Sequence, residues 1–186
     1  MREFLITCAL FMLTMNAVSA HAATPVGGAF TLTDQNGKLV SDSDFRSKFM
    51  MVFFGFTNCP DLCPTTALIM SQAMEQLKDD ASQVVPVFVS VDPERDTPEA
   101  LKTFLANFNP AFVGLTGTKD QLDKLQADYK TYSLKVDDKN AKDGHTFDHS
   151  GYIYLLDKDG KFLMVFTSDS SPQTIATKIR EYSHKP

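Results

Sequence analysis

The chain has 186 residues, of which 23 are acidic and 18 basic, so its formal net charge is −5. This length suits one domain with a sizeable core, and the hydrophobic share of 43% is ordinary for a globular protein. The acidic balance, together with the lack of a basic stripe, argues against nucleic acid as a partner.

The N-terminal residues predict a secretory signal. An apolar run from Phe4 to Val18 is followed by small residues that fit a cleavage site around Ala20. The run is shorter than the about 18 residues or more that favour a membrane span. We therefore expect residues 1–22 to be a signal peptide, or else an uncleaved membrane anchor. The mature protein is expected to be periplasmic or otherwise extracytoplasmic, and to touch the inner membrane only through such an anchor.

After the signal we expect a linker, residues 23–28, and one domain, residues 29–186. The domain begins with two short apolar stretches, 30–33 and 38–40, on either side of Asn36-Gly37. Asn-Gly accepts the positive φ angles of a tight turn, so this segment predicts a β-hairpin.

The rest of the domain alternates continuous apolar runs, typical of buried strands, with apolar residues at helical spacing. We expect, in chain order, strand 49–56, a helix after the cysteines, strand 84–91, a helix that begins at Pro98, strand 112–115, a helix around Leu122 and Leu125, a polar loop 135–144, a hairpin of strands 152–156 and 162–166, and a helix that begins near Pro172. This order predicts an α/β thioredoxin-like fold, with a central mixed sheet flanked by helices and an N-terminal β-hairpin.

Cys59 and Cys63 stand between the strand 49–56 and the helix that follows it. If Pro64 is the first helical residue, Cys63 is the N-cap, where backbone N–H groups and the helix dipole favour a thiolate. Two thiolates do not complete a tetrahedral zinc site. With one imidazole they suit copper, because soft sulfur selects Cu(I) and imidazole binds both copper oxidation states.

A histidine that completes such a site must come from elsewhere in the chain. His21 and His184 lie near the ends, whereas His145 and His149 shortly precede the predicted strand 152–156. In a thioredoxin-like sheet the loop that enters this strand faces the cysteine loop. The fold therefore nominates His145 or His149.

Four motifs span nearly the whole domain: Gly55–Pro64, Ser90–Pro98, Gly114–Gly117, and Asp148–Ser150 followed by Tyr154-Leu155. Together they resemble the Sco family of copper proteins. The resemblance implies a thioredoxin-like fold and copper, as Cu(I) and/or Cu(II), bound by Cys59, Cys63 and His149. It also implies a metallochaperone that serves the CuA centre of cytochrome c oxidase. The expected partners are the copper-receiving oxidase subunit and, in addition, a copper donor protein or a thioredoxin-like reductant.

Two positions depart from the family pattern. Asn58 replaces a histidine that is frequent there but is not a ligand. His145 replaces a residue that is usually aromatic, and this extra imidazole could compete for copper or help to receive it. Asp148 could orient His149 as a hydrogen-bond acceptor, or it could be a turn residue.

The main alternative is a thiol–disulfide oxidoreductase, which acts on the cysteines of the oxidase copper site or in redox defence. One cysteine would attack a disulfide and the other would resolve the mixed disulfide. Thioredoxin-type reductases carry a proline before the strand that faces the active site. The corresponding segment here, 147–151, has none, which favours metal binding and a carrier over an enzyme.

Two further alternatives remain open from the residues alone. An inert structural disulfide is common where two cysteines meet outside the cytoplasm. A peroxidase needs an arginine beside its cysteine, and Arg95 is the nearest candidate in the sequence.

The methionines at positions 50, 51, 70, 74 and 164 are expected to be core residues rather than copper ligands.

Overall fold

The computed structural model describes residues 25–184. The predicted signal, residues 1–22, and the first part of the predicted linker lie outside the described residues. Within the part of the chain that is described, no helix is both long and apolar enough to cross a membrane.

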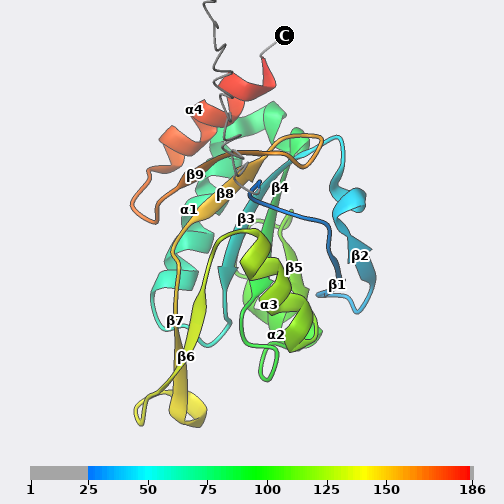
Figure 1. Ribbon diagram of the computed structural model, residues 1–186. Coiled ribbons are helices and arrows are strands. Elements are labelled where there is room, and N and C mark those ends of the chain that lie inside the picture. Colours follow the sequence, from blue (N-terminus) through cyan, green and yellow to red (C-terminus); the bar gives the residue numbers. More distant parts are fainter. Residues whose placement is uncertain (1–24, 185–186) are drawn as a thin grey trace, which may run out of the picture.

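A seven-stranded mixed sheet forms the centre of the molecule, in the order β2-β1-β5-β4-β3-β8-β9 (Figure 1). Its strands are β1 Thr31–Asp34, β2 Leu39–Ser41, β3 Phe49–Gly55, β4 Val84–Ser90, β5 Val113–Thr116, β8 Ile153–Leu156 and β9 Phe162–Phe166. The three middle strands β3, β4 and β5 are parallel, and every other pairing is antiparallel. The predicted N-terminal hairpin and C-terminal hairpin are both present.

Helices cover both faces of this sheet. They are α1 Leu62–Leu77, α2 Pro98–Leu105, α3 Lys119–Asp128 and α4 Pro172–Ser183, with short 3₁₀ turns η1 Asp42–Phe45, η2 Lys78–Gln83 and η3 Lys142–Gly144. On one face α4 packs against α1, and Phe104 of α2 meets Phe88 of β4 with ring centroids 5.2 Å apart. On the other face the ring of Tyr129, directly after α3, packs against the ring of Phe54, with centroids 5.2 Å apart. Such a covered mixed sheet is the predicted thioredoxin-like fold.

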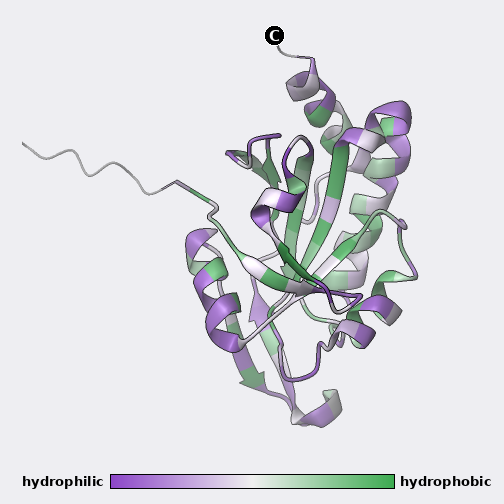
Figure 2. Ribbon diagram, turned by 90° about the vertical axis from the view of Figure 1, so that its right-hand side faces the viewer, coloured by the Kyte–Doolittle hydropathy of each residue, from purple (hydrophilic) through white to green (hydrophobic). Residues whose placement is uncertain are grey.

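The strand β3 is buried along its whole length because helices lie on both of its faces. Its apolar side chains are at most 3% exposed, and it pairs with β4 on one side and with β8 on the other. Figure 2 shows the consequence: hydrophobic colour concentrates in the central strands, whereas the outer helices carry hydrophilic stripes. The continuous apolar run therefore predicted a central strand correctly.

The first three residues of one predicted loop belong to a strand. Residues 135–144 were expected to be a polar connection, but β6 (Ser133–Asp137) pairs with β7 (His145–His149) in a separate antiparallel ribbon. The ribbon extends away from the main sheet (Figure 1). Leu134 and Val136 are 61% and 39% exposed, so no burial pattern marks the strand, and pairing with β7 supplies its hydrogen bonds instead.

Gly55, the last residue of β3, leaves room for the sulfur of Cys63. A Cβ at this position would lie 2.7 Å from Cys63 Sγ and 2.8 Å from a ring carbon of Phe53. Both neighbours are fully buried, so the Gly55→Ala variant should lower the free energy of unfolding by about 1–3 kcal/mol through overpacking. Denaturant unfolding of the reduced protein measures this change.

Gly151→Ala is the matched control, because the nearest atom to its Cβ would be 3.5 Å away, an ordinary contact. This variant should change the free energy of unfolding by less than about 0.5 kcal/mol. Equal unfolding midpoints for the two variants would contradict the packing argument.

Candidate metal centre

Three predicted donors meet in space although they are far apart in the sequence. Cys59 lies in the loop after β3, Cys63 in the first turn of α1, and His149 at the end of β7. One donor atom of each lies within 4.8 Å of the others, and Cys63 Sγ is 3.4 Å from His149 Nε2. Small movements of these side chains would place all three donor atoms at about 2.0–2.3 Å from one ion, the usual length of such bonds.

The start of α1 differs from the prediction. The helix begins at Leu62 rather than Pro64, and its N-cap is Asp61, whose carbonyl accepts the Thr65 amide at 3.1 Å. Pro64 fits inside the first turn because the first four amides of a helix have no intrahelical acceptor in any case. The prediction that Cys63 is the N-cap is therefore wrong.

Hydrogen bonds at the site favour a thiolate on Cys59 rather than on Cys63. The Cys63 amide donates to Cys59 Sγ at 3.4 Å, and hydrogen bonding from the Cys63 side chain lowers the pKa of Cys59 to about 4. Burial raises the pKa of Cys63 far above its ordinary value. The reduced pair thus has a thiolate on the half-buried sulfur of Cys59 and a thiol on the fully buried sulfur of Cys63.

His149 is 7% exposed, and its ring is held between aromatic edges. The rings of Phe53 and Phe56 lie 6.0 Å and 5.7 Å from it, centroid to centroid. Its Nδ1 is 3.2 Å from the carbonyl oxygen of Ser150, so an Nδ1–H donates there and the Nε2 lone pair faces Cys63. The prediction that Asp148 orients this ring is wrong, because Asp148 is exposed and the Ser150 carbonyl takes that place.

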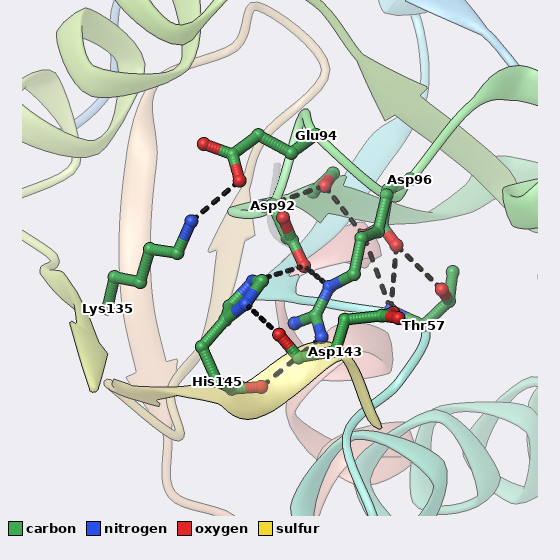
Figure 3. A network of polar contacts seen from close by, with 9 residues as sticks. Thr57, Asp92, Glu94, Asp96, Lys135, Asp143 and His145 are labelled. Atoms are coloured by element: carbon green, nitrogen blue, oxygen red, sulfur yellow. Dashed lines mark hydrogen bonds and ion pairs between the residues drawn. The ribbon is translucent and has the colours of Figure 1, made fainter. Parts of the chain in front are cut away.

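The buried carboxylate of Asp96 holds the start of the cysteine loop (Figure 3). It accepts the Thr57 amide at 3.1 Å, the Thr57 hydroxyl at 2.6 Å and the Ser90 hydroxyl at 2.7 Å. Burial raises the pKa of Asp96, and these hydrogen bonds oppose the shift. The sequence motif Ser90–Pro98 did not reveal this role of Asp96, because only the fold shows that the carboxylate is buried.

His145 does not join the cysteine pair. The structure brings it to Asp92 and Glu94 on the loop after β4, in a second group of donor atoms that also lie within 4.8 Å of one another. The methionines 50, 51, 70 and 74 belong to the hydrophobic core, and Met164 packs against it. Copper binding through their thioethers is therefore not needed to explain them.

The donor set of Cys59, Cys63 and His149 fits copper chemically. Two sulfurs and one imidazole nitrogen are ligands that Cu(I) prefers, and the imidazole also suits Cu(II). Phe53 and Phe56 keep one side of the group apolar, while the half-buried Cys59 connects it to solvent. An ion can therefore enter or leave past Cys59 while Cys63 and His149 stay buried.

Comparison with known proteins agrees with this arrangement. The family model described as SCO1/SenC matches residues 18–184. The SCO2-like protein of Rickettsia felis is 39% identical over 150 residues, which cover 81% of this chain and 73% of that protein. The structure of Bradyrhizobium japonicum ScoI with copper bound has a TM-score of 0.78 at 41% identity, and covers 84% of this chain and 99% of its own.

A second similar structure is that of BsSco, described as a member of the Sco family of cytochrome c oxidase assembly proteins in which a disulfide switch was identified. Its TM-score is 0.68 at 26% identity, with 87% of this chain and 96% of that chain covered. The matched family model and the identity to the Rickettsia relative lead to one conclusion: the chain belongs to the SCO1/SenC family.

Proposed function

We propose that this protein is an extracytoplasmic metallochaperone that binds copper through Cys59, Cys63 and His149 and delivers it to the CuA centre of cytochrome c oxidase. The observation that supports the site is the convergence of two sulfurs and one imidazole nitrogen from three separate elements. The copper-bound relative and the oxidase assembly family named above support the cargo and the destination.

Copper transfer would proceed by ligand exchange at the more accessible sulfur. Cys59 is half-buried, whereas Cys63 and His149 are buried. A thiolate of the receiving oxidase subunit can replace Cys59 first, and the buried donors can follow. The same route in reverse would load the protein from a copper donor protein.

The N-terminal apolar segment supports a periplasmic location, with attachment to the inner membrane if the segment is not cleaved.

A second candidate function is thiol–disulfide exchange, and the lowered pKa of Cys59 supports it. The Cys59 thiolate would attack a substrate disulfide, and one substrate sulfur would leave as a thiolate. Cys63 would then attack Cys59, lose its proton to the departing substrate sulfur and form a Cys59–Cys63 disulfide. A thioredoxin-like reductant would restore the two thiols.

The structure argues against the peroxidase alternative. Arg95 is poorly placed to assist a peroxidatic cysteine, because its guanidinium is bound to Asp92 and to the carbonyl of His145.

Loss of a copper ligand should weaken Cu(I) binding more than roughly 100-fold. Mutation of a residue that only hydrogen-bonds to a ligand already costs up to about that factor in metal affinity. We expect this for Cys59→Ser, Cys63→Ser and His149→Ala, because each removes one of three donors. Competition with a chromophoric Cu(I) chelator, under anaerobic reducing conditions, measures the affinity. His184→Ala, at the end of α4 and away from the site, should bind as the unmodified protein does. Equal binding by all four variants would refute the ligand assignment.

Disulfide exchange is tested separately by reduction of a model peptide disulfide with the metal-free reduced protein. Carrier function alone predicts slow, stoichiometric reduction, and the Cys63→Ser variant should stop at a mixed disulfide on Cys59. Rapid multiple turnover with added reductant, together with weak copper binding, would make the second candidate function the principal one.

Copper binding should release about one proton from the cysteine pair at pH 7.5, not two. The sign follows from the two pKa values: Cys59, with a pKa of about 4, is already a thiolate, whereas copper must displace the proton of Cys63, whose pKa is raised. The affinity for copper should therefore rise with pH above about 5, because one proton is displaced. Below the pKa of Cys59 it should fall more steeply with decreasing pH, because copper must then displace two protons. Calorimetry in buffers of different ionisation enthalpy counts the protons. Cys59→Ser should still release about one proton and Cys63→Ser almost none, so equal counts for the two variants would contradict the assignment.

A further inference from the structure

A second group of donors lies beside the first but contains no cysteine. Asp92 and Glu94 come from the loop after β4, and His145 is the first residue of β7. One carboxylate oxygen or imidazole nitrogen of each lies within 4.8 Å of the others. Two ligand atoms of one tetrahedral zinc ion lie about 3.4 Å apart at the usual bond lengths, so rotations of these side chains would have to bring the three atoms closer together by about 1 Å.

Each of the three side chains has one polar atom fixed by a partner (Figure 3). Arg95 Nε donates to Asp92 Oδ2, and Lys135 Nζ lies 2.6 Å from Glu94 Oε2. His145 Nδ1 lies 3.3 Å from the carbonyl oxygen of Asp143. Partners that hydrogen-bond to ligating carboxylates and histidines in this way orient the ligands of protein metal sites.

Two further polar atoms of the group, one on Asp92 and one on His145, lack such partners. Asp92 Oδ1 and His145 Nε2 are both buried and form no hydrogen bond with the described residues. The side chain of Asp92 is 1% exposed, and the 4.0 Å between its Oδ2 and His145 Nε2 is too long for a hydrogen bond. A buried carboxylate oxygen and a buried imidazole nitrogen without partners are costly, and a bound cation would satisfy both.

We propose that Asp92, Glu94 and His145 form a second metal site, which takes a divalent cation of the zinc or Cu(II) class rather than Cu(I). Two oxygens and one nitrogen are the donors that suit such ions, and no soft sulfur is present to select Cu(I). A cavity of about 250 Å³ borders Asp92 and Glu94 but not His145, and the exposed Glu94 opens the site to solvent. Arg95 and Lys135 already balance the two carboxylate charges, so the site is suited to weak, exchangeable binding.

An ion at this site would join two parts of the structure that carry the first centre. The loop that contains Asp92 also contains Asp96, which holds the cysteine loop. The strand that begins at His145 ends at His149. The second ion would therefore fix the position of His149 relative to the cysteines, without sharing a ligand with copper.

The test uses the full chain with Cys8→Ser and with Cys59 and Cys63 oxidised to a disulfide, so that no thiol can bind the probe. Zn(II) alone is titrated calorimetrically, and the ring protons of His145 are followed by NMR. This chain should bind one ion with a shift of the His145 signals. His145→Phe and Glu94→Gln should each weaken binding roughly tenfold or more, since ligands matter at least as much as their partners.

Glu99→Gln in α2 is the matched control, because it removes an exposed carboxylate outside the cluster and should bind zinc as before. Circular dichroism checks that each variant is folded. The proposal fails if zinc does not bind, as expected if His145 pairs with Asp92 as a cation instead. It also fails if His145→Phe and Glu94→Gln bind normally, or if binding is lost only with His149→Ala.

Discussion

The candidate copper centre depends on one buried carboxylate, that of Asp96. A charge without solvent is unfavourable, and here three short hydrogen bonds from Thr57 and Ser90 compensate for the lost hydration. These bonds connect the end of β4 to the loop that follows β3, so the two parallel strands present their carboxyl ends as one rigid edge. Cys59 and Cys63 follow directly after this edge in the chain, so the rigid edge determines where their sulfurs lie. Without this connection, Cys59 would be placed by the turn from its amide to the Phe56 carbonyl and by the Cys63 amide.

The two cysteines are chemically unequal although they are only four residues apart. Cys63 lies under Gly55 with no exposed surface, whereas Cys59 is half-buried and receives the Cys63 amide. Cys63 is therefore the protected sulfur, and Cys59 is the sulfur that a partner can reach first. The same asymmetry suits a carrier, which must hold an ion and release it, and suits thiol exchange, which needs one attacking and one resolving sulfur. The shared geometry explains why the two candidate functions are hard to separate on residues alone.

Much of the fold could be predicted because its strands are buried on both faces. The runs 49–56 and 84–91 predict central strands, and Pro98 predicts the start of α2. The structure adds the N-cap, where the Thr97 hydroxyl accepts the Ala100 amide. Strand β6 could not be predicted, because its stability comes from a partner strand and not from burial. The helix start at Leu62 was missed because proline tolerates several positions of a first turn. Likewise, the grouping of His145 with Asp92 and Glu94 rests on contacts between segments about fifty positions apart, which no local pattern encodes.

The placement of His149 on the ribbon β6–β7 has a consequence for hydrogen exchange. Two-stranded ribbons are marginally stable by themselves, and such segments open locally at a lower free energy than the core around them. When the ribbon opens, His149 departs and the ion keeps only two sulfur ligands. Linkage makes the relation reciprocal, since an ion that binds only the closed form stabilises that form. The amide exchange rates along β6 and β7 therefore report how firmly the neighbouring centre holds its ion, even though neither strand contributes a sulfur.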